Sequence, residues 1–303
     1  MARPVRALAL ALLALVCTAI PAATAAPAQR GPAIGFTGTY RSASGEPVRV
    51  ALAPAYGHDD AAVQSWGALV AGFVHGPEIR TVTVYVAPPD QVRRECAGAV
   101  ACYDPGLELL EVPGTDPGDG SSLPEIVAHE YGHHIAANRS NAPWDAYDRG
   151  TKRWASYEDV CAGVKAHTLF PGSQGAHYAR NPAEAFAESY RVLNGGTWSG
   201  VVDPSLAPDA TSLALLRADI VTPWRGGRTV MRRGTAPARV RIDTTLDGRL
   251  SATAPGRHIV VRDAGNGRVL GRGGRVRATI CGQDAVTVAV AGRGPFTLRV
   301  TIP

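Results

Sequence analysis

Apolar and polar positions follow two different repeats along the chain. In residues 59–75 the apolar side chains recur every three or four positions, which predicts an amphipathic helix. Residues 48–53, 79–86 and 107–112 alternate at every second position or form short apolar runs, which predicts three strands. These elements predict a small mixed sheet with helices packed on it.

The longest helical pattern follows a loop rich in Gly and Asp. Ser122 and Glu125 have the S-x-x-E spacing of a capping box, and Pro124 occupies the first turn, where its missing N–H costs little. We therefore expect a helix to begin at about residue 122. Three further helices are predicted over residues 144–168, 181–193 and 211–220.

The pattern changes to short alternating runs after Trp224. Gly, Asp or Asn separate these runs, which is typical of a small antiparallel sandwich. The runs cover residues 239–242, 249–253, 258–262, 275–280, 285–290 and 295–302. We predict an α+β domain over residues 26–224 and a small all-β sandwich domain over residues 225–303.

Residues 1–25 have the pattern of a signal peptide. Two arginines precede an apolar run over residues 7–20, and an Ala-Thr-Ala triplet at 23–25 fits the cleavage rule. The run is shorter than the roughly 20 residues of a membrane-spanning helix, and no later segment approaches that length. We therefore expect an exported protein with no membrane span; a lipid anchor at Cys17 is a minor alternative.

Charge is distributed unevenly between the two predicted domains. Residues 26–224 hold 14 Lys and Arg against 22 Asp and Glu, whereas residues 225–303 hold 15 Arg, no Lys and 4 Asp. The basic domain could bind an anionic cell-surface polymer, dock on the acidic domain, or only stabilise the fold. It has no Trp or Tyr and a single Phe, so it lacks stacking platforms and we expect no nucleic-acid binding.

Four cysteines follow the predicted signal peptide, and an exported protein usually oxidises an even number of them. Three pairings are possible. We favour Cys96 with Cys102, which closes a short loop, and Cys161 with Cys281, which would join the two domains. No C-x-x-C pair is present, which disfavours a structural zinc site built from these cysteines.

Residues 129–133 read His-Glu-Tyr-Gly-His, a complete H-E-x-x-H motif. On a helix, His129 and His133 lie one turn apart on one face, which is the geometry that zinc needs from two ligands. Glu130 falls beside them, where it could take a proton from a water molecule at the metal. His134 points away from His133, so we expect it at the surface or behind the ligands.

A third zinc ligand must come from another segment. The position six residues after the motif holds Arg139, which excludes the metzincin spacing. Glu184 falls in the first turn of the helix predicted after residue 181, and Glu188 lies one turn later, with small alanines between them. We assign Glu184 as the third ligand and Glu188 as the acceptor that orients a ligating histidine. Glu158 and Asp159 are the alternative.

The motif, together with the segment HYARNPAEAFAE at residues 177–188, resembles the catalytic end of the anthrax lethal-factor-like zinc metallopeptidases, a gluzincin group. The resemblance covers roughly residues 124–193 and implies a zincin-like catalytic domain. It implies zinc ligation by His129, His133 and Glu184, catalysis by Glu130 as the base, and an oxyanion donor at Tyr178, with His177 as its rival. In related folds the strand nearest the motif helix, here 107–112, pairs with the substrate backbone.

We therefore expect a secreted, monomeric zinc endopeptidase that acts on proteins or peptides. Two alternatives stay open: a secreted surface-binding protein whose metal site is structural or inactive, and a zinc amidase that acts on cell-wall peptides. Removal of zinc by a chelator separates the first alternative from an enzyme, because a binder keeps its adhesion.

Overall fold

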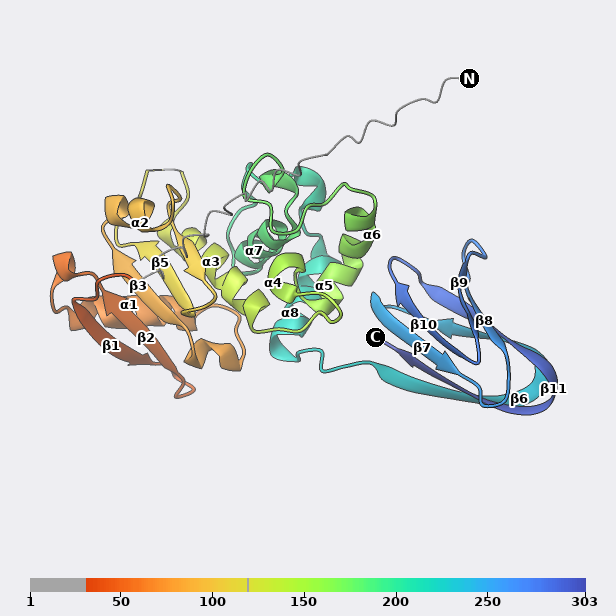
Figure 1. Cartoon of the computed structure of the whole chain (residues 1–303). Coiled ribbons are helices and arrows are strands. Elements are labelled where there is room, and N and C mark those ends of the chain that lie inside the picture. Colours follow the sequence, from red (N-terminus) through yellow and green to blue (C-terminus); the bar gives the residue numbers. More distant parts are fainter. Residues whose placement is uncertain (1–30, 119) are drawn as a thin grey trace, which may run out of the picture. The chain divides into compact units, whose positions relative to one another are not determined.

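The computed structural model describes residues 31–118 and 120–303, so the predicted signal peptide at residues 1–25 lies outside the described residues. The chain combines a mixed α+β region around a five-stranded sheet with a second, all-antiparallel sheet (Figure 1). The change from helices to strands falls between α8 (Ala210–Val221) and β6 (Arg228–Asp243).

The first sheet has the strand order β1-β2-β3-β5-β4, with β2, β3 and β5 parallel and the two outer strands antiparallel to their neighbours. Its strands are β1 (Phe36–Arg41), β2 (Pro47–Leu52), β3 (Thr83–Ala87), β4 (Cys102–Asp104) and β5 (Leu109–Pro113). Three of them match the predicted strands within a few residues, although residues 77–80 form a short 3-10 turn instead of the start of β3. The sequence pattern did not predict β1 or β4.

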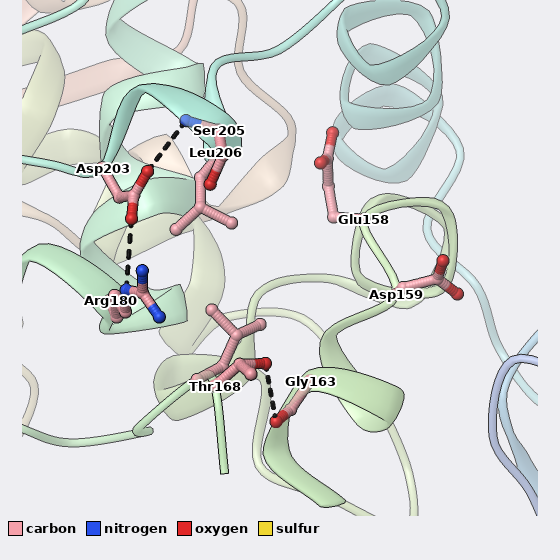
Figure 2. Close-up of a pocket in the computed structure, with 9 residues that line it drawn as sticks. Glu158, Asp159, Gly163, Thr168, Arg180, Asp203, Ser205 and Leu206 are labelled. Carbon is pink, nitrogen blue, oxygen red and sulfur yellow. Dashed lines mark hydrogen bonds and ion pairs between the residues drawn. The ribbon is translucent and has the colours of Figure 1, made fainter. Parts of the chain in front are cut away.

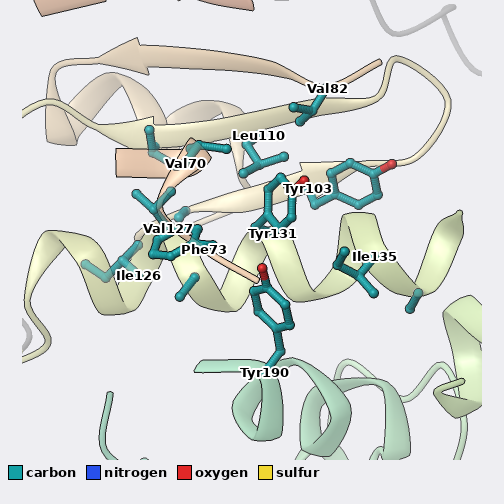
Figure 3. Packing of buried hydrophobic residues seen from close by; sticks show 14 of the residues in the cluster. Val70, Phe73, Val82, Tyr103, Leu110, Ile126, Val127, Tyr131, Ile135 and Tyr190 are labelled. Carbon is teal, nitrogen blue, oxygen red and sulfur yellow. The ribbon is translucent and has the colours of Figure 1, made fainter. Parts of the chain in front are cut away.

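Helices cover both faces of the sheet, and the side chains of β3 point to the two faces in turn. Val84 and Val86 pack with α1 (Asp60–Ala71) and α3 (Leu123–Ala137), whereas Tyr85 and Ala87 pack with α2 (Pro89–Glu95). Figure 3 shows the first of these layers, in which Tyr131 of α3 lies near Leu110 of β5 and Tyr190 of α7 (Pro182–Leu193). The helix that carries the motif is therefore held between the sheet and α7.

The start of α3 is the predicted capping box. Ser122 N donates to Glu125 Oε2 at 3.1 Å, and Thr197 N donates to Glu125 Oε1 at 2.9 Å. Hydrogen bonds from the backbone of Thr197 and then from Ser122 lower the pKa of Glu125 to about 2. The carboxylate thus joins the first turn of the motif helix to the loop that follows α7.

The helix predicted over residues 144–168 is three short helices, α4 (Ala146–Arg149), α5 (Lys152–Tyr157) and α6 (Val160–Lys165). Gly150 and Asp159 interrupt it, because both adopt positive φ, at 75° and 51°. The other two predicted helices are present as α7 and α8. Asn181 caps α7, since its side chain accepts from Ala183 N at 3.1 Å.

The second sheet has the order β10-β7-β11-β8-β9, with β6 also paired to β11. Its remaining strands are β7 (Gly248–Thr253), β8 (Ile259–Asp263), β9 (Val269–Gly273), β10 (Arg275–Ile280) and β11 (Ala285–Ile302). The predicted runs 285–290 and 295–302 are two halves of β11, with a register shift between Val290 and Gly294. The first half pairs with β8 and the second with β7, so one sheet folds over a single core, whereas we expected separate short strands in a sandwich.

Both favoured disulfides are present. Cys96 at the end of α2 is bonded to Cys102 of β4, and Cys161 of α6 is bonded to Cys281 after β10. Two disulfides fit an oxidising, extracellular environment. Among residues 31–118 and 120–303, no helix combines the length and apolar character needed to cross a bilayer.

A buried lysine adds to the connection that the Cys161–Cys281 disulfide makes between the α+β region and the second sheet. The Lys152 side chain is fully buried, and its Nζ donates to Ala142 O at 2.6 Å and to Asp247 O at 2.8 Å. The ammonium also lies 4.6 Å from the ring centroid of Trp224. Burial lowers the pKa of Lys152 to about 8.

Candidate metal centre

Close packing of α3 and α7 brings the predicted ligands together. The middle of α3 has no side chain at Gly132, and α7 presents small alanines such as Ala187 to it. The two helices therefore approach closely enough for the carboxylates of α7 to reach the histidines of α3.

Three donor atoms converge at this contact. His129 Nε2 lies 3.3 Å and His133 Nε2 lies 3.5 Å from Glu184 Oε2. One donor atom from each of the three residues lies within 4.8 Å of the others. Tetrahedral zinc with ordinary bond lengths to nitrogen and oxygen separates its ligand atoms by about 3.4 Å. The three side chains therefore fit a zinc ion with one position open.

Glu188 fixes the orientation of the first histidine. Its Oε1 accepts from His129 Nδ1 at 2.8 Å, which leaves His129 Nε2 directed at the cluster. The other carboxylate oxygen accepts from Ser199 N at 2.9 Å. This is the carboxylate–histidine arrangement that fixes the tautomer of metal-binding histidines. Among the described residues His133 Nδ1 has no such partner, so the two ligands are not equivalent.

The electrostatics of the cluster favour a cation. Burial lowers the pKa of His129, but hydrogen bonds to Glu184 and Glu188 outweigh it and raise that pKa to about 10. Burial raises the pKa of Glu184, and its hydrogen bonds to His129 and His133 bring it far below the usual range. Buried carboxylates thus stabilise positive charge at His129, and a divalent ion would supply that charge.

Glu130 is buried beside the ligands and is free to act as a base. Burial raises the pKa of Glu130, although the neighbouring His129 and His133 oppose the shift. Within the part of the chain that the structure describes, no group donates a hydrogen bond to this carboxylate. Its lone pairs are therefore available to a water molecule or a substrate proton.

The structure brings one of the two candidate oxyanion donors to the cluster. Tyr178 OH donates to Glu184 Oε2 at 2.8 Å, so the phenol lies next to the candidate metal position. Burial, and then the charge of Glu184, raise the pKa of Tyr178, which keeps the phenol protonated. His177 is exposed and stacks on Phe170 at 3.9 Å between ring centroids, away from the cluster.

Two further residues reach the site without having been predicted. Gln174 Nε2 donates to Glu184 Oε1 at 3.2 Å, and the Tyr147 ring centroid lies 6.0 Å from that of His133. Burial, and then the charge of Glu130, raise the pKa of Tyr147 to about 12. Gln174 lies in an irregular loop and Tyr147 in a four-residue helix, and neither segment has a sequence repeat that points to the motif.

The alternative ligands Glu158 and Asp159 lie elsewhere. Both line a separate pocket of about 240 Å³, together with the hydrogen-bonded pair Arg180 and Asp203 (Figure 2). Neither belongs to the group of donors around His129. Glu184 is therefore the acid that the fold brings to the two histidines.

We expected His134 at the surface or behind the ligands, but it lies in the core. Its side chain is fully buried, with Nε2 3.0 Å from Glu78 O and Nδ1 3.0 Å from Tyr103 OH. Because a carbonyl only accepts, Nε2 is the protonated nitrogen and Nδ1 accepts from the tyrosine. His134 thus joins α3 to the edge of the sheet.

No protein family model, curated protein or solved structure matches this chain. The functional interpretation therefore depends on the geometry of the site.

Proposed function

We propose that the chain is a secreted, monomeric zinc-dependent peptidase with a zincin-like catalytic domain. One observation carries the proposal: His129 Nε2, His133 Nε2 and Glu184 Oε2 converge at the distances of a tetrahedral zinc site, with Glu130 free beside them. The lethal-factor-like gluzincin pattern in the sequence assigns the same three ligands.

Each step of peptide hydrolysis has a residue of this chain that could carry it out. Zinc held by the three ligands supplies Lewis acidity, which lowers the pKa of water toward about 7 and polarises a carbonyl group. Glu130 accepts the proton of the attacking water and returns it to the leaving amine. Tyr178 donates a hydrogen bond to the oxygen on which negative charge develops.

The substrate strand differs from the one predicted by analogy with related folds. Residues 107–112 were expected to pair with substrate, but β5 already pairs with β3 on one side and β4 on the other. The edge strands of this sheet are β1 and β4, and Tyr103 of β4 contacts Tyr147, which in turn contacts His133. An extended peptide that adds to β4 would therefore lie beside the candidate metal centre.

Glu130→Gln tests the proposal, because it removes the base and keeps the shape of the side chain. We expect the variant to retain about one zinc per chain and to lose cleavage of a casein substrate. Glu158→Gln is the matched control, since Glu158 is a partly buried acid outside the cluster, and it should retain both zinc and activity.

Three results would contradict the proposal. Cleavage by Glu130→Gln at the unmodified rate would remove the assigned base. Zinc binding without cleavage of any protein or peptide by the unmodified chain would favour a surface-binding protein with a structural metal. Cleavage confined to cell-wall peptides would favour the amidase.

A further inference from the structure

One outward face of the second sheet carries a regular array of arginines and hydroxyl groups. Cross-strand register aligns β10, β7, the second half of β11 and the first half of β6, so that every second residue of each strand points to the same side. We call these twelve positions the arginine face: Thr229, Met231, Arg233, Arg249, Ser251, Thr253, Arg275, Arg277, Thr279, Thr297, Arg299 and Thr301. Five are arginines, six carry a hydroxyl, and none is acidic.

The five arginines have no partner within the described chain. All are exposed, and none of their guanidinium groups takes part in an ion pair or hydrogen bond with residues 31–118 or 120–303. The acidic residues of this sheet lie off the face, at its turns and strand ends: Asp243, Asp247, Asp263 and Asp284. The positive charge of the face is therefore not neutralised by the protein itself.

The bonds that join this sheet to the rest of the chain lie off the arginine face. The hydrogen bonds and the disulfide from the α+β region involve Asp247 and Cys281, through Lys152, Ser156 and Cys161. At one edge of the face, Arg249 and Thr301 line a pocket together with Ala142 and Pro143. Docking on the acidic region, one of the roles considered for the basic domain, therefore does not account for the other four arginines.

The chemistry of the face selects a phosphate-bearing polymer. Arginine presents a planar fork that matches phosphate, whereas the sheet has no lysine, and the hydroxyls between the arginines can bond polyol oxygens. Arg275 and Arg277 repeat about 6.8 Å apart along one strand, and neighbouring strands lie about 4.8 Å apart. Arg249, Ser251, Arg277 and Thr279 line a groove of about 490 Å³ within the array.

Other anionic partners fit this face less well. The face has no aromatic side chain on which nucleic-acid bases could stack. Met231 is its only apolar residue, so it offers little to insert into a lipid layer. We propose that the arginine face binds a linear polyol-phosphate polymer of the kind displayed on cell surfaces. If the chain is the proposed peptidase, this binding keeps the enzyme at the surface that carries the polymer.

The opposite half of the same sheet supplies a matched control. Arg239, Arg241, Arg262 and Arg272 share one outward side of β6, β11, β8 and β9. Two of them are already bound within the protein, since Arg241 pairs with Asp243 at 3.3 Å and Arg262 donates to Gly267 O at 3.0 Å. Replacing these four removes the same charge as replacing four arginines of the arginine face.

The experiment measures binding of poly(glycerol phosphate) to the full chain by calorimetry. The face variant carries Arg→Gln at 249, 275, 277 and 299, and the control variant carries Arg→Gln at 239, 241, 262 and 272. We expect the face variant to bind about tenfold or more weakly, because several exposed charge contacts are lost together. The control should change the dissociation constant less than about twofold.

If both variants bound the polymer equally weakly, net charge alone would explain the binding, and the proposal would be overturned. Tighter binding of single-stranded DNA, or of phosphatidylglycerol vesicles, than of the polymer would also overturn it. Both variants should cleave casein at the unmodified rate, since neither set touches the metal centre. Failure of this proposal is therefore distinguishable from failure of the proposed peptidase activity.

Discussion

Gly132 of α3 lies directly against Ala187 of α7. A Cβ atom at position 132 would be 2.8 Å from Ala187 Cα and 3.1 Å from Tyr190 Cβ. The first of these contacts is with backbone, which cannot rotate away. The glycine inside the H-E-x-x-H motif therefore sets the distance between the two helices that supply the candidate ligands.

Gly132→Val should separate α7 from α3 and displace Glu184 and Glu188. We expect zinc affinity to fall about ten- to hundredfold, as when the groups supporting a metal ligand are disturbed. Overpacking should also lower the free energy of unfolding by about 1–3 kcal/mol. Competition with a chromophoric chelator measures the affinity, and Gly175→Ala is the control because nothing lies within 4 Å of a Cβ there. Unchanged affinity in Gly132→Val would show that the helix spacing does not matter.

Glu188→Gln tests the support of His129. The amide keeps the size of the carboxylate but loses the charge that holds His129 Nδ1 protonated, so zinc affinity should fall about tenfold. Glu125→Gln is the matched control: Glu125 also accepts backbone hydrogen bonds next to α7 but does not contact either histidine. Equal losses in both variants would indicate a general effect on folding instead of ligand orientation.

Tyr178→Phe and His177→Ala separate the two candidate oxyanion donors. If Tyr178 stabilises the oxyanion, its removal should lower kcat about 10²- to 10³-fold while zinc content and KM change little. His177→Ala should leave kcat near that of the unmodified chain, because His177 stacks on Phe170 instead of facing the cluster. The opposite result, with activity lost only in His177→Ala, would transfer the role to the histidine.

Local spacing was sufficient to predict the ligand geometry. His129 and His133 are one helical turn apart, and so are Glu184 and Glu188, which fixes each pair on one face of its own helix. The helix start after residue 181 and the small alanines between the two acids indicated which second helix to choose, and the resemblance of residues 177–188 to a known pattern gave the same choice. Tyr147 and Gln174 could not be found this way, since a short helix and an irregular loop place them by tertiary packing alone.

The incorrect predictions also concern features that tertiary packing determines and local sequence does not. Helical geometry correctly places His134 away from His133, but it does not reveal that the sheet, not solvent, covers that side. Residues 107–112 were predicted to have a free edge because β4, a three-residue strand after a disulfide loop, has too few residues to show a repeat. In the second sheet, β11 continues through residues 291–294, where glycines in the sequence resemble a turn.

Stability should depend on pH through Glu111, a buried acid of β5 whose Oε2 lacks a partner among the described residues. Burial, and then the charge of Glu95, raise the pKa of Glu111 from 4.5 to about 7. The folded state thus binds more protons at Glu111 than the unfolded state between these values, so the contribution of Glu111 to stability is greatest below pH 4.5 and falls as the pH rises to 7.

Glu111→Gln should remove this contribution. Thermal unfolding at pH 5 and pH 8 should show a smaller decrease in Tm for the variant than for the unmodified chain. Glu108→Gln, at the half-buried position just before the same strand, is the control and should leave the decrease unchanged. A decrease of equal size in Glu111→Gln would assign the pH dependence to other groups.

Lys152→Met should weaken the connection between the α+β region and the second sheet. Methionine keeps the apolar stem but leaves Ala142 O and Asp247 O without their donor, which should cost about 1–3 kcal/mol in the free energy of unfolding. Lys165→Met is the matched control at the only other lysine, which is exposed, and should change stability by less than about 0.5 kcal/mol. Denaturant unfolding at pH 7 measures both variants.

The pH dependence of this difference identifies the lysine itself. Burial lowers the pKa of Lys152 from 10.5 to about 8, so the unfolded state binds more protons between those values. The unmodified chain should therefore gain stability relative to Lys152→Met as the pH rises from 8 to 10.5, because the buried charge is lost. A difference that stays constant across this range would mean that the ammonium is not buried in solution.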